Sequence, residues 1–176
     1  MLALEGLGAY LDVGLVILVS LYFLGACWFV LGTRRKNVTT DRVPMVSVVV
    51  AARNEAERIA GCLSVLLVQD YPHKQYEVIV VDDGSTDDTA GIIGEHLDSP
   101  VSVRLLQTEG LGSKKAALSL GIAEAKGDVI LSTDADCLVS LGWISGMVAH
   151  FREGVGFVIG YSQIGSASDI QTWRHG

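Results

Sequence analysis

The sequence contains little of what most zinc, redox and nucleic-acid sites are built from. Its 176 residues include only three cysteines and four histidines. The cysteines, Cys27, Cys62 and Cys137, show no C-x-x-C spacing, which argues against a zinc site and predicts reduced, non-catalytic thiols. The histidines are scattered and are more typical of surface positions than of metal ligands. Basic residues are also few, 13 against 20 acidic ones, so we expect no nucleic-acid partner.

The acidic excess lies in the part of the chain after residue 43. Residues 1–43 hold four Lys or Arg and three Asp or Glu, whereas residues 44–176 hold nine and seventeen. An acidic surface repels a phosphorylated ligand unless a metal ion bridges the two. A phosphate ligand of this domain is therefore expected to arrive with a divalent cation.

Charged residues are absent from one long stretch near the start. Residues 13–31 are uncharged and mostly apolar, and as a helix they would extend roughly 28 Å, close to a bilayer core. No Lys or Arg precedes them, which argues against a cleaved signal peptide. Arg34, Arg35 and Lys36 follow, and the positive-inside rule places them in the cytoplasm. We predict a single-pass transmembrane anchor over 1–32, a basic and polar linker over 33–43, and a cytoplasmic domain at the cell membrane over 44–176.

Apolar β-branched runs alternate with helical patterns after residue 44. Strands are predicted at 46–52, 76–81, 101–106 and 129–133, with a weaker one near 155–161. Helices are predicted at about 54–69, 86–97, 113–126 and 141–151. Asn54 and Glu57 form a capping-box signature for the first helix, and Ser113 is the expected cap of the third. This alternation predicts an α/β fold with a parallel sheet, and we take the strand order as 3-2-1-4.

Polar clusters follow the first, second and fourth strands. They are Arg53-Asn54-Glu55, Asp82-Asp83 and Asp134-Ala135-Asp136. In open parallel sheets a ligand sits beyond the carboxyl ends of the strands, where the strand order reverses, here between the first and fourth strands. The three clusters are therefore predicted to surround one crevice.

The D-x-D cluster is the expected metal site. Residues i and i+2 of an extended backbone point the same way, so Asp134 and Asp136 can face one ligand. Mg²⁺ and Mn²⁺ take oxygen ligands, usually one or two carboxylates together with water and phosphate oxygens. An isolated D-x-D is also typical of a solvated loop, and an isolated D-D-G-S of a simple turn.

Two lysines open the third predicted helix. Lys114 and Lys115 lie in its first turn, where the helix macrodipole disfavours cations. They indicate either a nearby anion or solvated surface lysines.

Four segments in this order and spacing carry a resemblance to a known family. They are V-S-V-V-V-A-A-R-N-E, V-I-V-V-D-D-G-S-T-D-D-T, G-S-K-K-A-A-L and G-D-V-I-L-S-T-D-A-D-C. From about residue 44 to 143 the chain resembles family 2 glycosyltransferases, inverting enzymes of the GT-A fold that use nucleotide-diphosphate sugars. The resemblance implies a Rossmann-like, mostly parallel sheet with flanking helices.

The resemblance also implies roles for particular residues. Ala51, Arg53 and Glu55 would border the nucleotide, and Asp83 or Asp82 would hold the base, usually uracil. Lys114 or Lys115 would lie near the nucleotide or diphosphate, and Asp134 near the ribose or donor sugar. Asp136 would ligate a divalent metal, Mg²⁺ or Mn²⁺. The implied reaction transfers a sugar from a donor, expected to be a UDP-sugar, to a saccharide or lipid-linked acceptor in envelope, polysaccharide or glycolipid synthesis.

The catalytic base is left unassigned. In the family it lies well downstream of the D-x-D, and neither Glu153 nor Asp169 has the expected E-D context. We expect it beyond Gly176, so the sequence is interpreted as truncated at its C-terminus. Two other functions stay open: a nucleotidyltransferase, although the Gly-rich, basic loop it needs after the first strand is missing, and a metal-binding, receiver-like signalling module.

Overall fold

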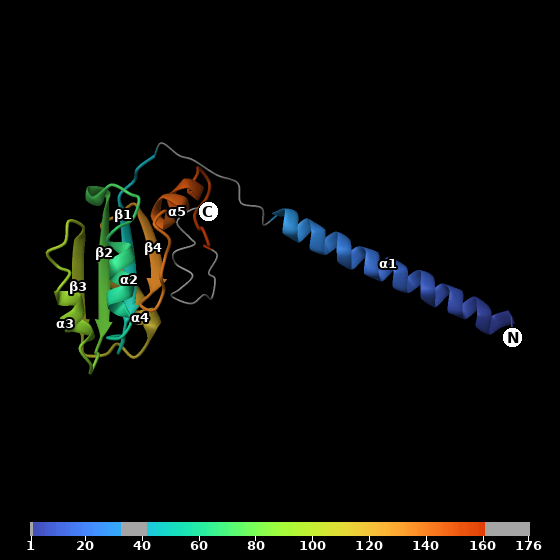
Figure 1. Cartoon of the computed structure of the whole chain (residues 1–176), viewed down its shortest axis with the longest axis horizontal. Helices are drawn as coiled ribbons and strands as arrows, with labels where there is room; N and C mark the ends of the chain where they lie inside the picture. The colour runs from blue at the N-terminus through green and yellow to red at the C-terminus, as the bar shows by residue number, and fades with distance from the viewer. Residues whose placement is uncertain (1, 33–41, 161–176) are drawn as a thin grey trace. The chain divides into compact units, whose positions relative to one another are not determined.

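The computed structural model of the protein describes residues 2–32 and 42–160 (Figure 1). The chain divides into two compact units, Met1–Asn37 and Val38–Gly176, and each is described by itself.

The first unit contains the helix α1, Leu2–Gly32. A helix over the uncharged stretch 13–31 is therefore confirmed. Crossing a bilayer takes about 20 consecutive, predominantly apolar residues in one helix. Within the residues that the structure describes, no helix reaches the length and apolarity of a membrane span. The predicted transmembrane anchor is thus not supported, and Arg34, Arg35 and Lys36, which oriented it, lie outside the described residues.

The second unit is built on a four-stranded sheet in the order β3-β2-β1-β4. The strands are β1 (Val46–Ala52), β2 (Tyr76–Asp83), β3 (Ser102–Thr108) and β4 (Val129–Asp134). All neighbouring pairs are parallel, and Val48 of β1 pairs with Val78 of β2 and with Leu131 of β4. The predicted α/β class and strand order are both confirmed.

Helices cover both faces of this sheet (Figure 1). One face packs on α2 (Ile59–Leu66), α3 (Thr89–Gly94) and α5 (Trp143–His150), and the other on α4 (Lys114–Ala123). Side chains alternate between the faces along each strand, so Val78 and Val80 join the larger core and Ile79 and Val81 the core under α4. The two central strands, β1 and β2, are buried on both sides, which explains their nearly continuous β-branched sequences.

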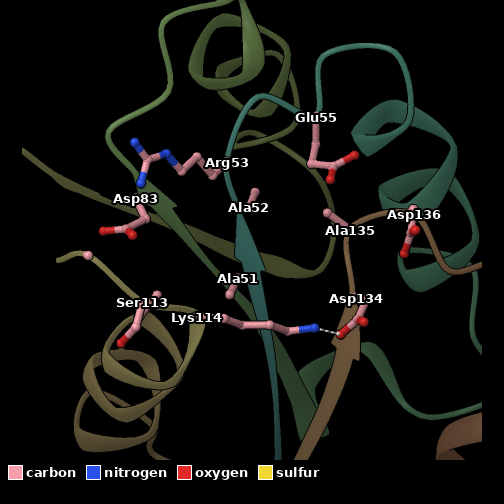
Figure 2. A pocket seen from close by; sticks show the side chains of 12 residues that line it. Ala51, Ala52, Arg53, Glu55, Asp83, Ser113, Lys114, Asp134, Ala135 and Asp136 are labelled. Carbon is pink, nitrogen blue, oxygen red and sulfur yellow. Dashed lines mark ion pairs between the residues drawn. The ribbon is translucent and has the colours of Figure 1, made fainter. Parts of the chain in front are cut away.

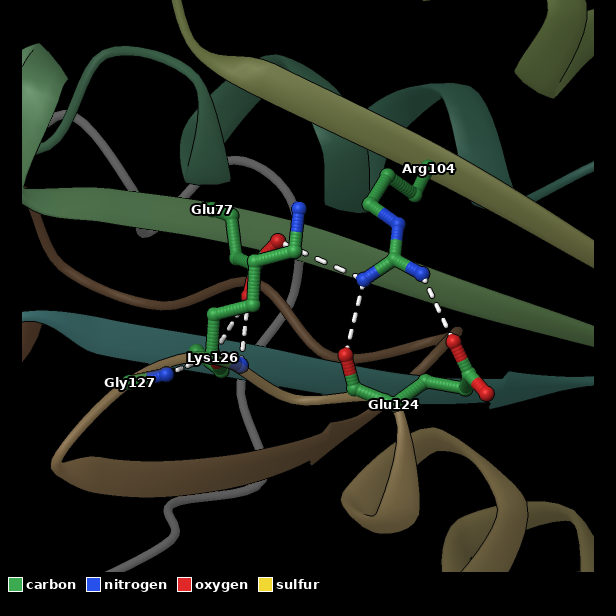
Figure 3. Close-up of polar contacts among 6 residues, drawn as sticks. Glu77, Arg104, Glu124, Lys126 and Gly127 are labelled. Carbon is green, nitrogen blue, oxygen red and sulfur yellow. Dashed lines mark hydrogen bonds and ion pairs between the residues drawn. The ribbon is translucent and has the colours of Figure 1, made fainter.

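A buried polar network near the N-terminal ends of the strands joins the sheet to the C-terminal end of α4 (Figure 3). The Glu77 carboxylate, 2% exposed, accepts hydrogen bonds from the Ser47 hydroxyl at 2.7 Å and the Lys126 backbone N–H at 2.9 Å. Arg104 lies 3.6 Å from this carboxylate and donates to the carbonyl oxygen of Glu124 at 2.8 Å. Because its partners come from β1, β2, β3 and the segment after α4, this network fixes the C-terminal end of α4 against the sheet.

Two local predictions are wrong. Asn54 does not cap α2, which begins only at Ile59; it lies at φ 55° and its side chain bonds to another loop. Residues 155–160 form no strand, and residue 161 lies outside the described part. The other predicted elements exist, although α2 and α3 are shorter than expected, and η1 (His73–Gln75) adds a short 3₁₀ turn before β2.

Candidate nucleotide-sugar site

A cavity of about 380 Å³ opens at the carboxyl ends of β1, β2 and β4 (Figure 2). Its lining comes from four segments far apart in the sequence, which the sheet topology brings together. The lining residues are Ala51, Ala52, Arg53, Glu55, Asp83, Gly112, Ser113, Lys114, Ala117, Asp134, Ala135 and Asp136.

Seven of the nine residues predicted to bind the nucleotide sugar or the metal line this cavity. They are Ala51, Arg53, Glu55, Asp83, Lys114, Asp134 and Asp136. Asp82 and Lys115 are not among the lining residues. The structure thus confirms the predicted convergence of the three polar clusters, whereas the binding role of each residue stays a prediction.

Strand alternation explains why Asp83 reaches the cavity and Asp82 does not. Asp83 follows Val81 on the face covered by α4, whereas Asp82 follows Val80 on the opposite face. The Asp82 carboxylate is buried and accepts hydrogen bonds from the backbone N–H and hydroxyl of Ser85. Asp82 therefore closes the turn after β2.

The Asp83 carboxylate holds the loop between β3 and α4. It is 5% exposed, and its Oδ1 accepts hydrogen bonds from the Thr108 hydroxyl at 2.9 Å and from the backbone N–H of Leu111. Gly112, in the same loop, has φ +77°, a conformation that L side chains rarely adopt. Asp83 thus fixes the loop that delivers Gly112 and Ser113 to the cavity.

A second set of hydrogen bonds connects the loops after β1 and β2. The backbone N–H of Glu55 donates to the Thr89 hydroxyl at 2.9 Å, and that of Ala56 donates to the Asp87 carboxylate at 3.1 Å. Glu55 itself is half-buried and forms an ion pair with Arg58 at 3.3 Å. Arg53 is exposed and extends towards the Asp83 side of the cavity (Figure 2). Both side chains are therefore presented by a loop that is held at several points.

The N-terminal end of α4 forms the wall opposite these loops. The Ser113 hydroxyl caps the helix by accepting from the Ala116 N–H at 3.2 Å, as the sequence predicts. Lys114 reaches across the end of β1 to Asp134, with 2.6 Å between its Nζ and the Oδ1 (Figure 2). Lys115 is exposed outside the cavity. The anion expected near the lysines is, in the structure, Asp134.

The D-x-D carboxylates lie at the end of β4, and both are exposed. Ala51 is the register partner of Asp134 on β1, and its small side chain leaves room in front of that carboxylate. Behind β4, the buried Cys62 thiol donates to the carbonyl oxygen of Asp134 at 3.5 Å. Burial, with smaller effects from Cys137, Asp136 and Asp134, raises the pKa of Cys62 to about 12. Cys62 is therefore a neutral packing residue.

The donor set fits a metal that brings phosphate oxygens with it. Among the described residues, no three or more His, Cys, Asp or Glu side chains are arranged to hold a metal ion by themselves. Mg²⁺ is usually bound by one or two carboxylates plus water and substrate phosphates, and Asp134 and Asp136 offer such a pair. Four carboxylates against two cations in the lining also favour a divalent ion.

Five lining residues were not predicted: Ala52, Gly112, Ser113, Ala117 and Ala135. Four are Ala or Gly, whose contribution is space, and composition gives no signal for that. The sequence pattern predicts Ser113 only as a helix cap, although its place just before Lys114 is a signal for the site.

Comparisons with known proteins agree with this geometry. Residues 47–176 match the family described as Glycosyl transferase family 2. The beta-monoglucosyldiacylglycerol synthase of Nostoc sp. is 31% identical over 172 residues, which are 96% of this chain and 36% of that protein. The glycosyltransferase AglE of Haloferax volcanii is 34% identical over 60% of this chain and 34% of its own length. The chain thus spans about a third of the curated relatives that it matches.

Solved structures show the same fold. The mannosyltransferase PcManGT of Pyrobaculum calidifontis, in complex with GDP-Man and Mn²⁺, superimposes with a TM-score of 0.64 and 28% identity. The match covers 73% of this chain and 38% of that one. TarS of S. aureus in complex with UDP gives a TM-score of 0.57 and 28% identity over 60% and 31% of the two chains. Because the family match covers the cavity and all of the described sheet except Val46, the chain belongs to glycosyl transferase family 2.

Proposed function

We propose that residues 44–176 form the donor-binding part of an inverting glycosyltransferase that uses a UDP-sugar together with Mg²⁺ or Mn²⁺. The observation that carries this proposal is the meeting of Arg53, Glu55, Asp83 and the Asp134–Asp136 pair around one cavity. A GT-A neighbour bound to GDP-Man and Mn²⁺ and another bound to UDP support it.

The side chains divide the cavity into regions of different chemistry. Asp83 and Arg53 lie together at the β2 side, where a carboxylate and a guanidinium can hydrogen-bond a base and a ribose (Figure 2). Lys114, Asp134 and Asp136 lie at the β4 side (Figure 2). A metal bound there would stabilise the negative charge that develops on the departing nucleoside diphosphate. The proposed arrangement therefore runs from the nucleotide near β2 to the diphosphate and sugar near β4.

The acceptor is proposed to be a glycolipid precursor or a saccharide. Three of the relatives are named beta-monoglucosyldiacylglycerol synthase, and two of these align over 96% of this chain. A diacylglycerol acceptor would place the reaction at a membrane surface. The predicted cytoplasmic location of the domain is part of this proposal.

Calorimetric titration of the full chain tests the donor site. We expect UDP and UDP-glucose to bind tightly only when Mn²⁺ is present, and Asp136→Ala to weaken this binding at least tenfold. Asp128→Ala is the matched control, because Asp128 is exposed just before β4 and does not line the cavity. GDP is titrated in parallel to determine which base the site accepts.

Three outcomes would contradict the proposal. No nucleotide binding with or without Mn²⁺ would exclude a donor site. Mn²⁺ binding that is indifferent to nucleotide would instead favour the receiver-like module. Nucleoside triphosphate bound much more tightly than diphosphate would favour a nucleotidyltransferase.

A further inference from the structure

Lys114 and Asp134 form an ion pair inside the cavity. The 2.6 Å distance between Nζ and Oδ1 joins the first residue of α4 to the last residue of β4 across the end of β1 (Figure 2). The other charged side chains that line the cavity are Arg53, Glu55, Asp83 and Asp136. The ammonium group of Lys114 therefore occupies one of the two carboxylates of the D-x-D pair.

The ion pair between Lys114 and Asp134 is weak enough for another anion to replace Asp134. The Lys114 and Asp134 side chains are 56% and 51% exposed, so solvent screens their attraction and the contact is weak. Lys114 also lies in the first turn of α4, where the helix macrodipole disfavours a cation. A ligand with more negative charge than one carboxylate, such as a diphosphate, would attract this ammonium group more strongly than Asp134 does.

We infer that Lys114 is an exchangeable counter-cation that makes nucleotide and metal binding depend on each other. Without donor, Lys114 neutralises Asp134 and lowers the affinity of the carboxylate pair for a divalent ion. When a nucleoside diphosphate binds, the Lys114 ammonium group moves to a phosphate oxygen. Asp134 is then free to bind the divalent cation. This inference rests on the proposed function and adds a dependence between the two ligands. The divalent cation is bound tightly only when the diphosphate is bound as well.

Lys115 provides a control that the chain itself supplies. It has the same charge and lies in the same helical turn, but it is exposed and does not line the cavity. A general effect of charge at the helix terminus would be equal for the two lysines. An effect of the pair with Asp134 would be confined to Lys114.

The experiment measures binding by calorimetry, using Mn²⁺ alone, UDP alone and both together. We expect Lys114→Met to bind Mn²⁺ alone about threefold to fivefold more tightly, because the competing ammonium group is gone. UDP alone should bind about tenfold more weakly, because a charge-assisted contact to phosphate is lost. The factor by which UDP enhances Mn²⁺ affinity should fall about threefold to fivefold, and Lys115→Met should leave all three values unchanged.

A double-mutant cycle completes the test. In an Asp134→Asn background, Lys114→Met should no longer change the affinity for Mn²⁺ alone, because there is no carboxylate left to neutralise. If the native chain binds UDP with Mn²⁺ but Lys114→Met leaves Mn²⁺ affinity unaltered, the exchange is wrong and the donor site stands. The same holds if Lys115→Met reproduces the change. If the native chain binds neither ligand, both proposals fail.

Discussion

The side-chain oxygen of Asn54 accepts a hydrogen bond from the backbone N–H of Thr86 at 2.8 Å. In return, the Asn54 N–H donates to the Ser85 hydroxyl at 2.9 Å. These bonds join the loop after β1, which carries Arg53 and Glu55, to the loop after β2. The cavity wall formed by the two loops therefore depends on a residue that does not line the cavity.

Replacing Asn54 should separate its two contributions. Asn54→Ala loses the bond to Thr86 and leaves a side chain at φ 55°, which should cost about 2 kcal/mol of unfolding free energy. Asn54→Gly loses only the bond and should cost about 1 kcal/mol, since glycine adopts this conformation readily. Urea denaturation measures both. The unfolding free energy of Glu57→Ala should stay within about 0.5 kcal/mol of that of the native protein. A large loss of stability in this variant would instead show that Asn54 and Glu57 do form a capping box.

Substitutions of Asp83 should distinguish loop anchoring from ligand binding. Asp83→Asn keeps an oxygen that can accept from Thr108 and Leu111, so we expect it to retain stability within about 1 kcal/mol. Asp83→Ala leaves both donors without this partner and should lose about 2 kcal/mol. Denaturant titration gives these values, and UDP titration should show weaker binding in both variants. Equal destabilisation by Asn and Ala would mean that the acceptor oxygen does not hold the loop.

Strand order and the location of the cavity could be predicted because they follow from short-range patterns. The β-branched runs at β1 and β2 indicate strands buried on both faces, and the alternation with helices leaves few parallel arrangements. Placing Asp83 and Asp134 at one edge then needs only the chain direction. The rule concerns strand ends, so it brought the three clusters together without any knowledge of side-chain contacts.

The remaining details depend on contacts between distant segments. Asn54 matches a capping box, but Ser85 and Thr86, some 30 residues away in the sequence, supply its partners. The choice between Asp82 and Asp83 depends on which face α4 covers, which a strand pattern does not show. The apolar residues near 155–160 resemble a strand, but a strand exists only where a neighbour pairs with it. In each case the local sequence pattern is present, but a contact with a distant segment determines the structure that the residues adopt.

The buried thiol of Cys62 should make stability fall at high pH. Its pKa is raised from 9.0 to about 12 in the folded protein, mainly by burial. Between these values the unfolded chain loses the proton and the native protein keeps it, so the free energy of unfolding decreases as pH rises, by at most about 1.4 kcal/mol per pH unit. Cys62→Val should show a shallower decline between about pH 9 and pH 11.

The measurement is urea denaturation at several pH values. Burial also raises the pKa values of Tyr71 and Tyr76, which gives a decline of the same sign above about pH 10 in both proteins, so the difference between them is the informative quantity. Cys27→Val, at an exposed position on α1, should follow the native curve. Identical curves for Cys62→Val and the native protein would contradict the assigned protonation.

Close packing of α4 on the sheet should be sensitive to one added methyl group. A Cβ at Gly121 would lie 2.4 Å from Cγ1 of Val49 and 3.1 Å from Cγ2 of Val81. Gly121→Ala should therefore push α4 away from the sheet and cost about 2 kcal/mol of unfolding free energy. Gly61→Ala, on α2, would meet only Leu138 at 3.6 Å and should be neutral or slightly stabilising.

The Gly121→Ala substitution should also affect the cavity, because the N-terminal end of α4 forms part of the cavity wall. Lys114 begins α4, so a displaced helix lengthens the distance from its ammonium group to Asp134 and moves the Ser113 cap out of the cavity wall. Gly121→Ala should therefore weaken UDP binding in the presence of Mn²⁺, although residue 121 does not line the cavity. Val49→Ala removes the methyl group that the new Cβ would meet, so the double variant should recover UDP affinity even if it does not recover full stability. Loss of UDP affinity that persists in the double variant would show that helix position is not what Gly121 controls.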